Sequence, residues 1–190
     1  MYRNQGHLGA AWRYCRTFGL PATLRLAQHV VNAKRHKQSI NDSCDHAGVR
    51  CENTSDVNAK DFLASLVSMQ PDVIVSVSCP QIFKLDLIDI PKKACLNVHG
   101  ALLRNYRGMM PSFWMLANGE KEAGVSVHFI EERLDAGDVC GQTRFEILAG
   151  ESLDMFLRRS KRFAADLLTA VLERLEGQAR SIRRVVLLVA

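Results

Sequence analysis

Two polar residues, Asn97 and His99, stand near the end of the apolar segment "ACLNVHG", residues 94–100. Side chains alternate between the two faces of an extended chain, so Asn97 and His99 point to one side while Leu96 and Val98 point to the other. An imidazole can take up and return a proton near neutral pH, and an amide N–H can stabilise an oxyanion. The spacing therefore predicts two groups aimed at one reacting atom. The alternative is a polar loop at the end of a core strand.

A carboxylate that orients the imidazole or tunes its charge would complete such a site. Asp135, in the turn sequence "LDAGD", is the best candidate, although this sequence is also common in ordinary turns. His128 raises the alternative of a metal site with His99, Cys140 or Asp138. The spacing of these residues matches neither a zinc nor a calcium motif, so we expect no metal.

The segments around these residues alternate between patterns typical of strands and of helices. Apolar or alternating runs predict strands over 48–52, 73–79, 94–100, 123–132 and 138–147. Helical patterns predict helices over 55–72, 110–120 and 152–175, with a short helix or turn within 81–92. Strands that alternate with helices predict an α/β fold with an open, mostly parallel, Rossmann-like sheet. Ligands bind such sheets beyond the carboxyl ends of the strands, where Asn97 and His99 stand.

Two of these helices carry further expectations. The helix over 55–72 should begin at a cap formed by Ser55 or Asp56. Its buried side should consist of Phe62, Leu63, Leu66 and Val67. The run from Ser152 to Leu175 keeps helical spacing for more than six turns and predicts a long amphipathic helix.

The chain should divide into three parts. Residues 1–40 are a basic segment with an amphipathic helical pattern between Leu8 and Lys37, interrupted at Gly19 and Pro21. The segment from Gln38 to Cys44 is an expected polar linker. Residues 41–176 form the α/β core, and residues 177–190 form a tail or one more strand from "VVLLVA".

Composition limits the possible functions. The 190 residues, 47% of them hydrophobic, suffice for one compact domain. The net charge of +5 includes a stretch, residues 1–40, with seven Lys or Arg and no acidic residue, but no nucleic-acid-binding module is recognisable. The six cysteines are scattered, as is typical of reduced thiols. Neither a membrane-spanning run nor a secretory signal is present, and we expect a soluble cytoplasmic protein without stable membrane insertion.

Several motifs of nucleotide and acyl-transfer chemistry are absent from the sequence. It contains no G-x-S-x-G elbow, no Walker loop and no G-x-G-x-x-G fingerprint. These absences argue against nucleotide hydrolysis and dehydrogenation.

The segment "LNVHGALLRNYRGMMPSFWMLANGEKEAGVSVHFIEERLDAGDV", residues 96–139, resembles the core of the formyltransferases that use 10-formyltetrahydrofolate. Their pattern is Asn-x-His, a Leu-Leu pair, Tyr-Arg-Gly or a variant, a Pro-containing helix ending in Asn/Thr-Gly, Gly-Val-x-Val-His and then Asp-x-Gly. All of these occur here in the same order. With the flanking segments, the resemblance extends over residues 44–176.

The resemblance implies that Asn97, His99 and Asp135 form a catalytic trio. An acceptor amine would attack the formyl carbon, and Asn97 with protonated His99 would stabilise the oxyanion. His99 and Asp135 would manage the proton that passes to the folate nitrogen. The residues implied in binding the 10-formyltetrahydrofolate co-substrate are Gln81, Ile82, Phe83 and Asp135. The residues implied in binding the acceptor substrate are Tyr106, Arg107 and Gly108.

The acceptor is less narrowly defined by the resemblance. "NVHGALL" and "YRG" look closer to the enzymes that formylate amino groups of nucleotide-linked sugars than to the purine-pathway enzyme. Formylation of methionyl-tRNA or of glycinamide ribonucleotide, and hydrolysis of 10-formyltetrahydrofolate, are alternatives within the enzymes. The alternative outside active enzymes is a catalytically weak folate-binding or membrane-peripheral remnant that acts through a partner bound by its basic N-terminal helix. A homodimer is possible in either case.

The sequence departs from the family pattern at two places. Arg104 follows Leu103 where the family has proline, which changes the stiffness of the loop beside the expected site. The family opens with a strand, a glycine-bearing loop and a helix, and the first forty residues show no such strand. We therefore expect an N-terminally incomplete fold of the formyltransferase type.

Overall fold

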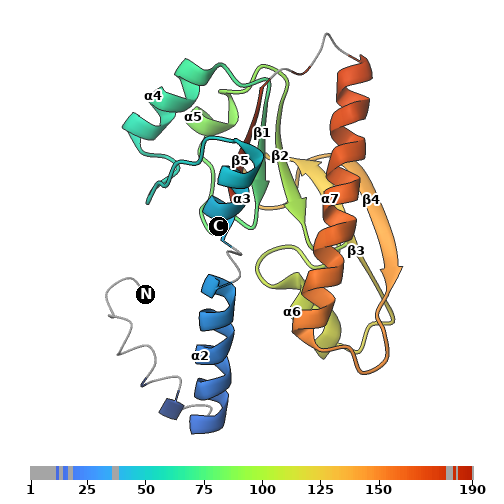
Figure 1. Cartoon of the computed structure of the whole chain (residues 1–190). Helices are drawn as coiled ribbons and strands as arrows, with labels where there is room; N and C mark the ends of the chain where they lie inside the picture. Colours follow the sequence, from blue (N-terminus) through green and yellow to red (C-terminus); the bar gives the residue numbers. More distant parts are fainter. Residues whose placement is uncertain are drawn as a thin grey trace. The chain divides into compact units, whose positions relative to one another are not determined.

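The computed structural model of the chain describes residues 12, 15–16, 19–35, 39–178, 182 and 184–189. The chain divides into two compact units, Met1–Asn53 and Thr54–Ala190. The five-stranded sheet lies in the second unit (Figure 1).

The first unit carries the helices α2 (Leu20–Arg35) and α3 (Ile40–Ala47). Gly19, with a φ of 83°, directly precedes α2, so the predicted interruption at Gly19 is confirmed. Pro21 lies in the first turn of α2, where a missing N–H removes no helical hydrogen bond. The prediction that Pro21 interrupts the helix is therefore wrong. Most of the helical piece predicted before Gly19 falls outside the described residues.

The polar linker predicted over residues 38–44 is wrong, because α3 occupies most of it. Ser39 accepts a hydrogen bond from the backbone N–H of Asp42, and the Asp42 carboxylate accepts one from the backbone N–H of Ser39. This reciprocal capping box satisfies N–H groups that a helix start leaves unpaired. The local cap therefore stabilises a helix in a segment with few apolar residues.

The strand predicted over residues 48–52 is also wrong. Gly48 has a φ of 65° and ends α3, and the N–H of Val49 donates to the carbonyl of Cys44. Residues 49–54 then continue without helix or strand. Val49 is 58% exposed, so no core contact favours an extended segment here.

The sheet of the second unit has the order β4-β3-β2-β1-β5. Its strands are β1 (Val73–Val77), β2 (Ala94–His99), β3 (Glu122–Phe129), β4 (Val139–Glu146) and β5 (Val185–Val189). β1 pairs in parallel with both β2 and β5, whereas β3 pairs antiparallel with β2 and with β4. Every strand except β3 therefore runs in one direction. The predicted open, mostly parallel α/β fold is confirmed.

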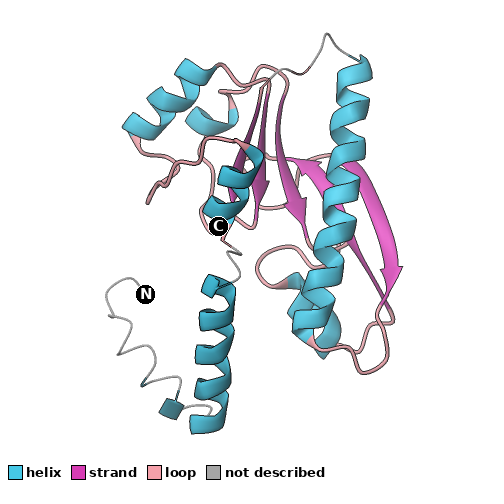
Figure 2. Ribbon diagram, in the orientation of Figure 1, coloured by secondary structure: helices cyan, strands magenta, loops and turns pink. Residues whose placement is uncertain are grey.

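Helices cover both faces of this sheet (Figure 2). On one face, α4 (Lys60–Met69) and α5 (Leu85–Ile88) pack on β1, β2 and β5 through Leu66, Leu87, Ile74, Cys95 and Leu188. On the other face, α7 (Leu153–Gln178) packs on β1, β2 and β3 through Val171, Val75, Leu96 and Val127. The alternation of side chains along each strand fills both cores.

The helix predicted over 55–72 is α4, but it begins later than expected. Ala59 precedes its first residue, and no side chain caps it. The Asp56 carboxylate instead accepts from the N–H of Asn58 within a preceding turn, so the predicted cap at Ser55 or Asp56 is wrong. Leu66 is fully buried as predicted, whereas Val67 is 57% exposed and does not belong to the buried side.

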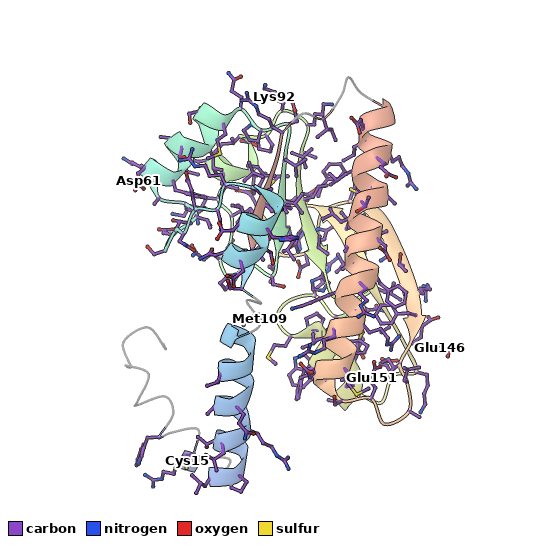
Figure 3. All side chains as sticks on the ribbon, in the orientation of Figure 1. Cys15, Asp61, Lys92, Met109, Glu146 and Glu151 are labelled. Carbon is purple, nitrogen blue, oxygen red and sulfur yellow. The ribbon has the colours of Figure 1, made fainter. Side chains whose placement is uncertain are left out.

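The long predicted helix is confirmed as α7, and "VVLLVA" contributes β5 at the edge of the sheet. Hydrogen bonds of the Arg159 side chain connect the start of α7 with the end of β4. It binds the Glu151 carboxylate and donates to the carbonyl of Glu146, and both of these residues are labelled in Figure 3. In the part of the chain that the structure describes, no helix is long and apolar enough to cross a membrane.

Candidate active site

The site lies at the carboxyl end of β2, where the loop of residues 100–110 begins. Asn97 and His99 both reach the carboxylate of Asp135, in the turn after β3. The Asn97 amide nitrogen donates to Oδ1 of Asp135 over 3.4 Å, and Nδ1 of His99 lies 3.7 Å from Oδ2. The structure therefore brings the three predicted residues together, with Asn97 and His99 on the same side of the strand.

Tight packing of the turn holds Asp135 in place. Asp135 has a φ of 48°, and Gly137 follows two residues later. A Cβ atom at Gly137 would lie 2.0 Å from the carbonyl oxygen of Phe129, so only glycine fits there. The N–H of Phe129 donates to the carbonyl of Asp138. The turn is thus folded back onto the end of β3.

The Asp135 carboxylate is buried among nitrogen atoms. Besides the bond from Asn97, it accepts a hydrogen bond from the backbone N–H of Gly108 over 2.8 Å, and Nε2 of His128 lies 3.5 Å from its Oδ1. Burial raises the pKa of Asp135, but its polar contact with His128, the hydrogen bond from the Gly108 N–H and the electrostatic attraction of His99 outweigh it and lower the pKa below its usual value. The group is therefore a carboxylate over the whole neutral range.

His128 is a fourth member of this cluster, and the sequence did not assign it to the trio. Its side chain is only 2% exposed, and its Nε2 lies 3.1 Å from the Asn97 amide nitrogen. Asn97 and His128 face each other directly across the antiparallel ladder of β2 and β3. Only the register of that ladder reveals the contact, because the residues are 31 positions apart.

The second nitrogen of His99 contacts the loop that follows β2. Nε2 of His99 lies 2.8 Å from the carbonyl oxygen of Tyr106, so it carries a proton and donates. Nδ1 faces the carboxylate of Asp135 at 3.7 Å. Each ring nitrogen of His99 thus faces an oxygen atom, the carbonyl of Tyr106 or the carboxylate of Asp135.

The loop is held in place by the buried Ser126 on β3 and by Gln142 on β4. Ser126 donates to the carbonyl of Ala101 and accepts from the N–H of Leu103. The Gln142 amide donates to the carbonyl of Leu103 and to the Ser126 hydroxyl. These bonds fix the segment between the carboxyl end of β2 and Arg104.

The predicted acceptor residues lie on this loop. Gly108 contacts Asp135 through its N–H, and the Tyr106 hydroxyl donates to the carboxylate of Glu120. Arg107 and Arg104 are exposed, as is Met109, which Figure 3 labels on the loop before α6 (Pro111–Ala117). Two guanidinium groups therefore stand on the loop whose backbone binds the Asp135 carboxylate.

The predicted donor residues lie on the loop after β1. The Gln81 amide bonds to the backbone of Ser55 and Val57, and the carbonyl of Ile82 accepts from Asn58. Phe83 is buried in the core, whereas Ile82 is 70% exposed. In the hydrogen bonds of the described residues, this loop is joined to residues 55–58 rather than to the cluster around Asp135.

The described residues contain no group of three or more His, Cys, Asp or Glu side chains placed to hold a metal ion. What the cluster offers is acid–base and hydrogen-bond chemistry. One carboxylate lies between two imidazoles, with an amide beside it. Such a group can stabilise a negative oxygen and can move a proton between two nitrogen atoms.

Residues 23–172 match the family model described as formyl transferase. The chain belongs to the formyl transferase family. This match includes the whole cluster around Asp135 and the helices α3 to α6. The resemblance inferred from residues 96–139 is therefore confirmed.

The names of family members that resemble this chain specify different acceptors. The methionyl-tRNA formyltransferase of Clostridioides difficile (strain 630) is 40% identical over 102 residues, which cover 52% of this chain and 33% of that protein. The crystal structure of phosphoribosylglycinamide formyltransferase from Streptococcus pneumoniae TIGR4 superposes with a TM-score of 0.64 at 22% identity, over 72% of this chain and 79% of the other.

A sugar N-formyltransferase from Shewanella sp. FDAARGOS_354 superposes with a TM-score of 0.58 at 23% identity, over 87% of this chain and 72% of the other. At these identities the two solved structures establish a shared fold. The chain spans a third of the length of the Clostridioides relative.

Proposed function

We propose that this formyl transferase family chain transfers a formyl group from 10-formyltetrahydrofolate to an amine acceptor. The observation that carries the proposal is the convergence of Asn97, His99 and Asp135 at the carboxyl end of β2. An amide, an imidazole and a carboxylate are the groups that acyl transfer between two nitrogens requires. The reaction forms a bond from the acceptor nitrogen to the formyl carbon and breaks the bond from that carbon to the folate nitrogen.

When bound, 10-formyltetrahydrofolate would supply an activated formyl group whose oxygen gains negative charge as the amine adds. The His99 imidazolium donates to that oxygen from Nε2, the nitrogen that now donates to the Tyr106 carbonyl. Asn97 adds an N–H from the same side, namely the one held by Asp135 over the long distance of 3.4 Å. Both donors are thereby directed at one oxygen.

The same groups handle the proton that the amine must lose. His99 transfers a proton to the leaving folate nitrogen and receives one from the acceptor nitrogen, so that no net proton is gained or lost by the protein. The Asp135 carboxylate stabilises the imidazolium between these transfers. Gly108 holds that carboxylate through a 2.8 Å hydrogen bond and thus ties the acceptor loop to the catalytic group.

Two exposed apolar side chains on the segments that we assign to the donor suit the flat, partly apolar ring of a folate. Ile82 and Leu134 are large apolar residues that are 70% and 60% exposed. They belong to the two segments that we assign to the donor, the loop after β1 and the turn that leads into Asp135. Polar backbone groups flank both side chains and can bond the edge of such a ring.

For the acceptor, we propose the amino group of a nucleotide-linked sugar. Arg104 and Arg107 are exposed on the loop beside Asp135, and no described side chain pairs with either of them. Guanidinium groups bind phosphates in a bidentate manner. A diphosphate attached to an amino sugar would place its negative charge on this loop and its amine near His99.

Methionyl-tRNA is the second candidate acceptor. It is favoured by the 40% identity to the Clostridioides methionyl-tRNA formyltransferase. An aminoacylated tRNA end also combines a phosphate with a primary amine, so Arg104 and Arg107 suit both acceptors. The amine differs, since one belongs to a sugar ring and the other to an amino acid.

An acceptor panel tests the proposal. The full chain is incubated with 10-formyltetrahydrofolate and, separately, with nucleotide-linked amino sugars, methionyl-tRNA, glycinamide ribonucleotide or water, and products are identified by mass spectrometry. His99→Ala should lower kcat by about 100-fold to 10,000-fold, the usual contribution of a positioned acid–base group. His46→Ala, an exposed histidine on α3, serves as the matched control and should leave kcat unchanged.

Binding of a folate analogue is measured in parallel by calorimetry. Folate binding without turnover that depends on His99 would replace the proposal by a folate-binding protein that acts through a partner. Failure to bind any folate analogue would contradict both functions.

A further inference from the structure

Two independent neighbours determine how the Asn97 amide is oriented. Its nitrogen lies 3.1 Å from Nε2 of His128 and 3.4 Å from Oδ1 of Asp135. An amide group has two N–H donors on one end and an acceptor oxygen on the other. Its orientation therefore depends on whether these two neighbours are acceptors.

The other ring nitrogen of His128 shows which role Nε2 takes. Nδ1 lies 2.8 Å from the carbonyl oxygen of Phe129, which can only accept, so Nδ1 carries a proton. In the neutral ring, Nε2 then holds a lone pair. The nearer neighbour of Nε2 is the Asn97 amide nitrogen at 3.1 Å, which donates to it, and Oδ1 of Asp135 lies farther away at 3.5 Å. The Asp135 carboxylate can also only accept. Rotating the amide by half a turn would point its oxygen at both the lone pair of His128 and the carboxylate, which is repulsive.

We propose that His128 is a positioning residue, whose neutral ring accepts one N–H of Asn97 and thereby directs the other toward the side where Asp135 and His99 lie. The inference rests on the proposed function, because that second N–H is the one assigned to the formyl oxygen. His128 touches neither reacting group itself. It acts through Asn97, which it faces directly across the β2–β3 ladder.

The burial of His128 alone would be explained equally well by packing. The ring is 2% exposed and lies edge-on to that of His99, with 6.4 Å between ring centres. A packing role needs only the volume of the ring, whereas a positioning role needs an acceptor at Nε2. Two substitutions separate these needs. His128→Gln replaces Nε2 by an amide oxygen at similar reach, and His128→Asn keeps only a donor near Nδ1.

Histidine nitrogen chemical shifts test the first half of the proposal without any activity. In ¹⁵N-labelled protein at neutral pH, long-range proton–nitrogen correlations should show a protonated Nδ1 and an unprotonated Nε2 for His128. The signals are assigned by their loss in His128→Gln. A proton on Nε2, in either the neutral or the charged ring, would overturn the proposal because Asn97 could not donate there.

Kinetics test the second half. His128→Asn should lower kcat by about 100-fold, as expected when a catalytic group is misplaced by about 1 Å, and should leave KM for the folate donor unchanged. His128→Gln should retain kcat close to that of the native chain. Equal kcat in the two variants would overturn the proposal, since both remove the ring and only one keeps the acceptor. If no acceptor is formylated at all, the proposed function fails, and the nitrogen shifts still decide the tautomer.

Discussion

Nδ1 of His99 lies 3.7 Å from Oδ2 of Asp135, and both side chains are more than nine-tenths buried. The two residues come from β2 and from the turn after β3, so their contact requires the antiparallel pairing of these strands. An imidazole and a carboxylate removed from water interact more strongly than the same groups at the surface. The contacts around this pair should make the stability of the protein depend on pH and on single substitutions.

The stability of the protein should depend on pH through Asp135. Burial raises its pKa, but the polar contact with His128, the hydrogen bond from Gly108 and the electrostatic attraction of His99 bring it below the usual 3.8. A carboxyl with a lowered folded-state pKa stabilises the fold fully above its unfolded-state pKa, and this contribution is lost as the pH falls through the folded-state value. Urea unfolding between pH 7 and pH 2 should therefore show a decline below about pH 4 that Asp135→Asn reduces.

Asp166→Asn is the control for this experiment. Asp166 is exposed on α7, so its substitution should leave the acid decline intact. An acid decline that is identical in native protein and Asp135→Asn would show that Asp135 has no favourable partners in the folded state.

Ser126→Ala should loosen the loop that carries the proposed acceptor residues. The hydroxyl of Ser126 is completely buried and bonds to Ala101, Leu103 and Gln142. Alanine leaves these groups unpaired, which should cost about 1–3 kcal/mol of unfolding free energy. KM for the acceptor should rise as well, because the loop is no longer fixed. Chemical denaturation and steady-state kinetics check both effects, and Ser68→Ala on the exposed side of α4 should change neither.

Gly137→Ala should disrupt the turn that places Asp135. The added Cβ would meet the Phe129 carbonyl oxygen at 2.0 Å, and backbone atoms cannot rotate away as a side chain can. We expect a loss of at least about 3 kcal/mol in unfolding free energy and a loss of turnover. Gly177→Ala on α7 is the matched control, because no atom lies within 4 Å of its added Cβ. That variant should gain up to about 1 kcal/mol from helix propensity. A fully active and stable Gly137→Ala protein would contradict the close approach.

The sequence predicted those features that depend on local periodicity. Alternation in "ACLNVHG" placed Asn97 and His99 on one side of a strand, and both side chains do reach Asp135. The long apolar spacing after Ser152 predicted α7. Such patterns follow from the regular repeat of one strand or one helix. Contacts with other parts of the chain do not change that repeat.

Features that depend on distant pairing or on a single cap were missed. The contact of His128 with Asn97 arises from the register of β2 against β3, which no local pattern encodes. The helix α3 was predicted as a linker because its few apolar residues hid the Ser39 capping box. From the sequence, His128 was considered only as a metal ligand. Its partners Asn97 and Asp135 are 31 and 7 residues away along the chain, so no local pattern indicated these contacts.

The edge strand β5 offers a test of how the sheet is completed. Leu188 is 8% exposed and packs with Ile74 and Leu66, whereas its neighbour Leu187 is 55% exposed on the other side of the strand. Leu188→Ala should lower the unfolding free energy by about 2–5 kcal/mol, because it removes buried methyl groups and leaves a cavity. Leu187→Ala removes the same atoms from a half-exposed position and should cost less than half as much. Urea denaturation of both variants compares them, and equal losses would mean that β5 does not pack on the core in this register.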